Sequence, residues 1–122
     1  MNDNRRFSED SIFVKIEEQY KRIECSEILY IEASGSYSII RMKDTELTLT
    51  YHLSGIESFI PDTIFLRVHR SYIVNKQYIS CLLKNTLIIG KATIPIGRTY
   101  KEKLISSFNI IDNRKLIKNK QD

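Results

Sequence analysis

Two arginines, Arg70 and Arg98, are the side chains of this sequence whose positions best suit recognition chemistry. Arg70 lies inside the apolar run FLRVHRSYIVN of residues 65–75, and Arg98 follows the strand-like stretch ATIPIG. At a strand end or tight connection, the flanking chain fixes the backbone while the guanidinium projects outward. A guanidinium held in this way suits the O6/N7 edge of guanine and phosphate oxygens. From these residues alone, an ordinary exposed arginine is the alternative.

Other kinds of site chemistry find little support in the sequence. The two histidines, His52 and His69, have no cysteine, histidine or carboxylate at a metal-binding interval. The stretch ASGSYS lacks the pattern of a nucleophile elbow, and IGKAT lacks the glycine-rich loop that cradles phosphates. We therefore predict a protein that is not an enzyme and needs no metal or cofactor.

Charge is distributed unevenly along the chain. Residues 1–63 carry 7 basic and 12 acidic side chains, a balance of −5. Residues 64–108 carry 8 basic side chains and one acid, a balance of +7, and residues 109–122 add +2. Such asymmetry suggests a surface that faces a polyanion, although basic strands that simply face water would give the same pattern.

The length of the chain and its cysteines restrict the class of protein to which it can belong. A chain of 122 residues fits one domain, and its first ten residues show no signal peptide. Its apolar stretches fall short of the roughly 20 residues that span a membrane. Cys25 and Cys81 lack zinc-ligand spacing and are read as reduced rather than disulfide-bonded. The sequence thus predicts a soluble, cytoplasmic protein with no membrane partner.

The elements that must position the arginines are mostly strands. Short stretches rich in Ile, Val, Tyr and Thr alternate with turn residues, which favours an antiparallel β fold. The predicted strands are SIFVKI, ILYIEAS, YSIIRMK, LTLTYHL, FLRVHR, YISCLL, TLIIG and ATIPI. The run His69-Arg70-Ser71 interrupts the apolar pattern, so we expect a tight connection there.

Two segments have helical spacing instead. LSGIESFIP, residues 53–61, predicts a helix of about two turns that Pro61 stops. RTYKEKLISSF, residues 98–108, carries Thr99 and Glu102 at capping-box spacing, which would place Arg98 just before the cap. We interpret residues 1–10 as a flexible lead-in, residues 11–108 as the domain, and residues 109–122 as a basic tail.

The stretch FLRVHRSYIVNKQYIS resembles the signature of the LytTR family of bacterial DNA-binding domains. ILYIEASGSYSII is similar to the family's early strand pair, LSGIESFIP to its short helix, and IPIGRTYKEKL to its closing strand, arginine and final helix. The four pieces stand in the family's order and the resemblance covers residues 11–108. It implies a mostly β fold, an elongated stack of small antiparallel sheets with one or two short helices.

The resemblance also implies a mode of DNA binding in which loops and strand ends read the bases. Two regions would enter neighbouring major grooves, with the protein across the minor groove between them. The matching positions are the loop Ser36, Tyr37 and Ser38, then Arg70, then Arg98, with phosphate contacts at Ser71, Thr99 and Lys101. Tyr37 has the alternative of packing at a strand start. We expect His69 to support Arg70, and Asn75 and Tyr72 to be structural.

General attraction to phosphates is a separate task, which we assign to lysines of the basic half. These are Lys76, Lys84, Lys91, Lys101 and Lys103. Family members commonly carry serine before the third-region arginine, whereas Gly97 stands there in this chain. Most members also carry an amino-terminal receiver domain controlled by phosphorylation. This chain shows none, so it is either a fragment from such a histidine-kinase pathway or a stand-alone regulator.

Three functions stay open on the sequence alone. The leading hypothesis is a sequence-specific regulator of transcription that binds double-stranded DNA, acting in pairs, as a homodimer, on direct repeats about one helical turn apart. The second is a LytTR-like protein-interaction module that modulates another regulator without binding DNA. The third is a single-strand-binding barrel in which Tyr37, Tyr72 and Tyr78 stack on bases.

Overall fold

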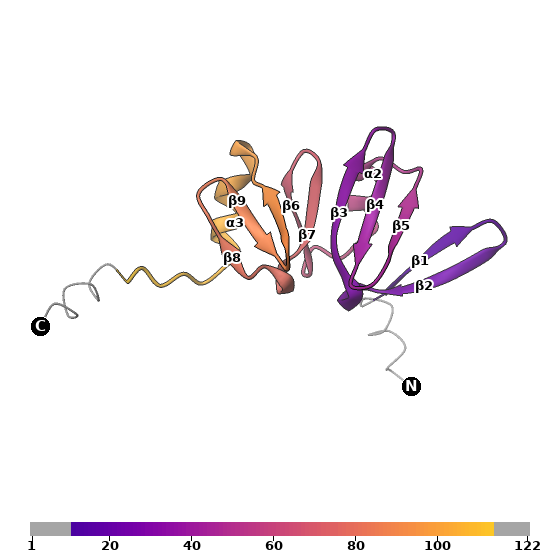
Figure 1. Cartoon of the computed structure of the whole chain (residues 1–122), viewed down its shortest axis with the longest axis horizontal. Coiled ribbons are helices and arrows are strands. Elements are labelled where there is room, and N and C mark those ends of the chain that lie inside the picture. Colours follow the sequence, from indigo (N-terminus) through magenta and orange to yellow (C-terminus); the bar gives the residue numbers. More distant parts are fainter. Residues whose placement is uncertain (1–10, 114–122) are drawn as a thin grey trace, which may run out of the picture.

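The computed structural model describes residues 11–113 and consists of three antiparallel sheets that stand side by side along its long axis (Figure 1). A two-stranded sheet lies at one end, a five-stranded sheet in the middle and a three-stranded sheet at the other end. The predicted class is confirmed: residues 11–113 form a mostly β, elongated stack of small sheets, with two short α-helices among them.

The strands follow one another with short connections. The two-stranded sheet pairs β1 (Ser11–Ile16) with β2 (Gln19–Glu24). The five-stranded sheet has the order β5-β4-β3-β7-β6, with bounds β3 Ile28–Ser34, β4 Tyr37–Met42, β5 Glu46–Leu49, β6 Phe65–His69 and β7 Tyr72–Asn75. The three-stranded sheet has the order β10-β9-β8, with bounds β8 Cys81–Leu82, β9 Thr86–Ile89 and β10 Ala92–Pro95.

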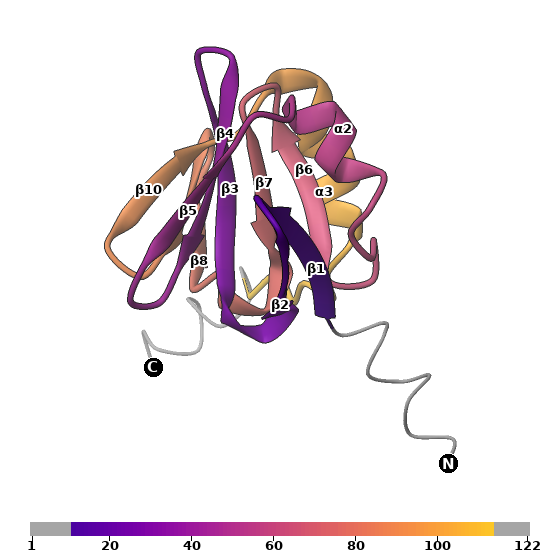
Figure 2. The same cartoon turned by 90° about the vertical axis from the view of Figure 1, so that its right-hand side faces the viewer.

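The helical elements are brief. The α-helices are α2 (Leu53–Glu57) and α3 (Lys101–Ser106). Single 3₁₀ turns are η1 (Cys25–Glu27), η2 (Lys76–Tyr78) and η3 (Arg98–Tyr100). Seen along the long axis, α2 and α3 lie on the same side of the strands, and the β3–β4 turn projects at the top (Figure 2).

The central sheet is buried on both faces, because a separate core packs on each. Ile73 belongs to the core shared with β1, β2 and α2, whereas the next residue, Val74, belongs to the core shared with β9, β10 and α3. Successive residues of a strand point to opposite faces, so apolar residues on both faces of β7 are required. This explains the apolar run YIV, residues 72–74, that follows the turn Arg70-Ser71 in the sequence.

Several predicted elements differ from those in the structure. β2 was not predicted, because its sequence QYKRIE is largely polar and buries Ile23 alone among its six residues. The predicted strand YISCLL is wrong in its first half, where η2 ends at Tyr78 and β8 begins at Cys81. α2 ends at Glu57, after little more than one turn, and leaves Phe59 exposed.

The capping box predicted at Thr99 and Glu102 is wrong. Arg98 and Thr99 belong to η3, α3 begins only at Lys101, and its cap residue, Tyr100, makes no side-chain capping hydrogen bond. Arg98 therefore starts a 3₁₀ turn after Gly97 rather than preceding a capped helix.

The predicted domain, residues 11–108, lies within the described residues 11–113. The predicted lead-in, residues 1–10, and residues 114–122 of the predicted basic tail lie outside the described residues. Residues 109–113 are described and adopt neither helix nor strand. Between residues 11 and 113, no helix has the length and hydropathy that crossing a membrane demands.

Candidate nucleic-acid interface

The three segments expected to contact DNA lie at one end of the strands, which we call the upper edge after its place in Figure 1 (residues 34–37, 70–71 and 97–101). Backbone hydrogen bonds connect them. The N–H of Ala33 donates to the carbonyl of Ser71 at 2.9 Å, and the N–H of Gly97 donates to the carbonyl of Val68 at 2.8 Å. Residues far apart in the sequence are thereby held next to one another through rigid backbone.

The first segment is the turn between β3 and β4. Gly35 takes a φ of 62°, a conformation that a side chain would strain, and the turn closes between Ser34 and Tyr37. Ser36 and Tyr37 are exposed, with 49% of Tyr37 accessible. Tyr37 therefore faces solvent at the upper edge instead of packing into a core.

Ser38 is not available for the contact expected of it. Its side chain is fully buried, and its hydroxyl donates a 2.6 Å hydrogen bond to the carbonyl of Tyr51. Because Ser38 follows Tyr37 on a strand, its side chain points to the opposite, inward face. We correct the predicted first region to Ser36 and Tyr37.

The second segment is the turn Arg70-Ser71, which joins β6 to β7 as the sequence predicted. Arg70 is exposed, whereas the backbone around it is firmly held. Arg67 donates through Nε to the carbonyl of His69 at 2.8 Å and through Nη2 to the carbonyl of Arg70 at 2.5 Å. His69 accepts the N–H of Ser71 on Nδ1 at 3.0 Å, so it supports the turn directly.

The third segment is Gly97 with η3. Arg98 and Thr99 are exposed, and Lys101 is half-buried at the start of α3. A Cβ on Gly97 would lie 2.9 Å from Cδ2 of Tyr100 and 3.6 Å from Cα of His69. A side chain at position 97 would therefore collide with the ring of Tyr100, whereas its distance to His69 would be an ordinary van der Waals contact. The hydrogen bond between Gly97 and Val68 is what joins η3 to the end of β6.

The arginines of the described region divide into paired and unpaired groups. Arg41 lies between Glu32 and Glu46, Arg22 lies near Glu24, and Arg67 contacts Glu57 at 2.7 Å. The hydrogen bond that Arg41 donates to the carboxylate of Glu32 raises the pKa of Arg41. Within residues 11–113, Arg70 and Arg98 form no ion pair, so both guanidinium groups can meet an anion or a base edge.

The basic lysines do not all share the upper edge. Lys101 belongs to it, and Lys84 lies close by, because the neighbouring Asn85 accepts a 2.8 Å hydrogen bond from the N–H of Ile96. Lys76 follows β7, which runs away from the Arg70 turn, and Lys91 lies in the turn between β9 and β10 at the far end of that hairpin. Lys76 and Lys91 are therefore poorly placed to meet a duplex on the upper edge.

The tyrosines proposed as a stacking platform lie apart. Tyr37 is on the upper edge, while Tyr78 is in η2 at the opposite end, where its hydroxyl donates to the carbonyl of Ser26. Tyr72 is half-buried, with its ring 6.2 Å from that of Tyr30 and 5.7 Å from that of His69. This arrangement gives no support to a single-strand-binding surface built from these three side chains.

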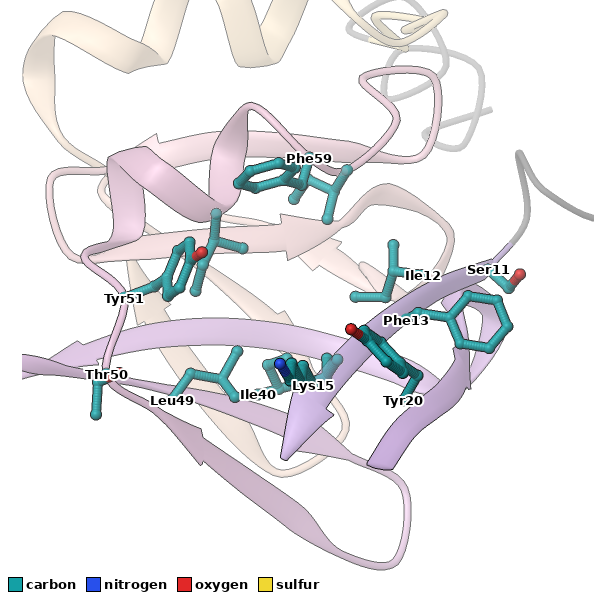
Figure 3. A pocket seen from close by; sticks show the side chains of 13 residues that line it. Ser11, Ile12, Phe13, Lys15, Tyr20, Ile40, Leu49, Thr50, Tyr51 and Phe59 are labelled. Carbon is teal, nitrogen blue, oxygen red and sulfur yellow. The ribbon is translucent and has the colours of Figure 1, made fainter. Parts of the chain in front are cut away.

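A groove of about 430 Å³ lies between β1, the end of β5 and α2 (Figure 3). The aromatic side chains of Phe13, Tyr51 and Phe59 line it and are each more than half exposed. Among its lining residues in the described part of the chain, Lys15 alone is charged. An apolar groove of this kind offers little to phosphates. The described residues also contain no group of three or more potential metal ligands.

Arg67 and its partner Glu57 were not singled out in the sequence. The signal was available, since Arg67 alternates with the apolar Leu66 and Val68 and lies on the same side of the strand as His69. What the sequence does not show is that its guanidinium folds back onto the following turn.

Comparisons with known proteins agree with this geometry. The family model described as LytTr DNA-binding domain matches residues 18–109. A curated relative, "Sensory transduction protein LytT" of Bacillus subtilis (strain 168), is 26% identical over 107 residues, which are 83% of this chain and 44% of the relative. The chain thus spans less than half of that relative's length.

A solved structure has the same fold. It is the "LytTr DNA-binding domain of putative methyl-accepting/DNA response regulator from Bacillus cereus", with a TM-score of 0.70, 20% identity, and coverage of 83% of this chain and 98% of that one. The similarity at this identity establishes the architecture. Together with the family match over most of the chain, it leads to one assignment: this chain belongs to the LytTr DNA-binding domain family.

Proposed function

We propose that this domain binds double-stranded DNA with sequence preference and regulates transcription, with Arg70 and Arg98 as the base-reading side chains. The observation that carries the proposal is the exposure of these two side chains and their freedom from ion pairs within the described part of the chain. Both guanidinium groups are exposed and free of ion pairs with described residues, on two segments joined by the Gly97–Val68 hydrogen bond. Membership of a DNA-binding family supports the same conclusion.

The remaining residues of the upper edge take supporting roles in this proposal. Ser36 and Tyr37 enter one major groove and Arg98 the next, and the domain lies across the minor groove between them. Arg70, next to these segments, reaches a guanine edge in a major groove. Ser71, Thr99 and Lys101 contact phosphates, and Lys84 adds sequence-independent attraction. Two copies bind direct repeats about one helical turn apart. In a longer protein, a receiver domain in a histidine-kinase pathway would control this pairing.

Selection of bound duplexes from a random pool tests the proposal and yields the preferred site. Arg70→Ala and Arg98→Ala should each reduce the ratio of affinities for selected and random duplexes. A bidentate contact to guanine supplies about 1–3 kcal/mol, so the ratio should fall between roughly 5-fold and 150-fold. Lys91→Ala, at the far end of its hairpin, is the matched control and should leave the ratio unchanged.

The alternative function, a protein-interaction module, predicts no binding to DNA. A titration with random duplex at two salt concentrations distinguishes this alternative from a DNA-binding domain, because phosphate contacts bind more tightly as the salt concentration is lowered. Absence of binding even at low salt would overturn DNA binding and favour the module. Binding without any preference in the selected pool would refute sequence recognition alone.

A further inference from the structure

The guanidinium of Arg67 forms all of its hydrogen bonds with neighbouring groups of the same chain. It lies in β6, three residues before Arg70, and its side chain is only 16% exposed. Its three guanidinium nitrogens all donate: Nε to the carbonyl of His69, Nη2 to the carbonyl of Arg70, and Nη1 to Glu57 at 2.7 Å. The guanidinium therefore wraps the turn that carries Arg70 and joins this turn to α2.

The chemistry of this contact requires arginine. A register shift between Arg67 and His69 interrupts the ladder of β6 with β7, so strand pairing alone does not satisfy the carbonyls of the turn. A planar guanidinium presents donors in a fixed fork that reaches two neighbouring carbonyls at once, whereas the ammonium of lysine is a point charge on a flexible stem. Lysine at this position would keep the charge and lose the paired contact.

The turn is also the point to which the other two segments attach. The carbonyl of Val68 accepts the N–H of Gly97, and the carbonyl of Ser71 accepts the N–H of Ala33. With the two carbonyls held by Arg67, four successive carbonyls from residue 68 to residue 71 are all bonded to groups outside the turn. A shift of this turn would change the spacing between the contact segments.

We propose that Arg67 is the positioning residue for base reading: it fixes the Arg70 turn, and through it the relative placement of the three contact segments, without itself touching DNA. This inference rests on the proposed function, and it makes Arg67 the residue on which the specificity of DNA binding depends. Side chains that read bases must be held to within about 0.5 Å, and Arg67 supplies that restraint at the turn where the segments meet.

The test is a set of binding measurements on Arg67→Lys with the selected duplex and with random duplex, each at several salt concentrations. The ratio of the two affinities should fall by roughly tenfold, within the range that loss of one bidentate base contact spans. Affinity for random duplex and its salt dependence should stay at wild-type values, because no phosphate contact is removed. The test for a direct phosphate contact uses Arg67→Gln, which removes the charge. A salt slope shallower by about one unit in Arg67→Gln would show such a contact and overturn the proposal.

A double-mutant cycle distinguishes positioning from a separate contribution. If Arg67 acts through the Arg70 turn, then Arg67→Lys should lower the affinity ratio less in an Arg70→Ala background than in the wild-type protein. Additive losses would refute this. Glu57→Gln removes the ion pair but keeps both bonds to the turn, so it serves as the matched control and should preserve the ratio.

Two further measurements distinguish an effect of the substitution on folding from an effect on DNA recognition. Thermal unfolding followed by circular dichroism shows whether Arg67→Lys retains the fold. If it does not, Arg67→Gln, which keeps one donor, takes its place with the same expected loss of preference. A wild-type protein that prefers no duplex would refute the proposed function, whereas a wild-type preference that Arg67 variants retain would refute the positioning role.

Discussion

Asn75 offers the sharpest test of how the central sheet is held. It is fully buried at the end of β7, and its side chain makes three hydrogen bonds. Nδ2 donates to the carbonyls of Cys25 at 3.2 Å and Ile28 at 3.0 Å, and Oδ1 accepts the N–H of Gln77 at 2.9 Å. One side chain thus connects η1 and β3 to the start of η2, across about fifty residues of sequence.

The expected cost of Asn75→Ala follows from these bonds. Each is worth about 1 kcal/mol net, so their loss should lower the free energy of unfolding by about 3 kcal/mol. For a domain of this size, that corresponds to a fall in Tm of roughly 15 °C. Asn75→Asp keeps the acceptor for Gln77 and removes the donor to the two carbonyls, so it should also destabilise.

Urea unfolding followed by circular dichroism measures the change. Asn85→Ala is the matched control, because Asn85 is an exposed asparagine in the β8–β9 turn and should change stability by less than about 0.5 kcal/mol. A loss below about 1 kcal/mol for Asn75→Ala would refute the reasoning, since it would mean that the buried network contributes little.

Three further predictions concern separate parts of the fold. Lys101→Ala should weaken binding to every duplex and reduce the salt slope by about one unit, whereas Lys91→Ala should not. Glu17 has a φ of 54°, so Glu17→Gly should stabilise the protein by about 1 kcal/mol in urea unfolding, and Glu18→Gly should not. Burial raises the pKa of Tyr30, with Glu32 adding to the effect. The protonated phenol therefore stabilises the fold fully below about pH 10, the pKa of tyrosine in the unfolded chain. This stabilisation is lost as the pH rises through the raised pKa of Tyr30 in the folded protein. Tyr30→Phe should abolish this pH dependence when the free energy of unfolding is measured against pH.

The sequence predicts the fold well where strands alternate and turns are marked. The tight connection at Arg70 follows from a polar triplet between apolar runs, and the structure confirms it. The turn at Gly35 follows from glycine between two strands. In both cases the information is local, within about ten residues.

The rest depends on contacts between distant segments. Ser38 is buried because the chain after β5 places the carbonyl of Tyr51 against it, which the residues around Ser38 do not reveal. The spacing of Thr99 and Glu102 fits a capping box, yet Gly97 bonds to β6 and the chain enters a 3₁₀ turn instead. The placement of Lys76 and Lys91 away from the upper edge likewise follows from strand direction in the assembled sheets.

The joints between the three upper-edge segments are made by main-chain atoms, at Ala33 with Ser71 and at Gly97 with Val68. Amide and carbonyl groups occur in nearly every residue, so these joints survive exchange of the outward side chains at positions 36, 37, 70 and 98. The framework can therefore be retargeted one position at a time, by natural variation or by design, while its shape is inherited unchanged.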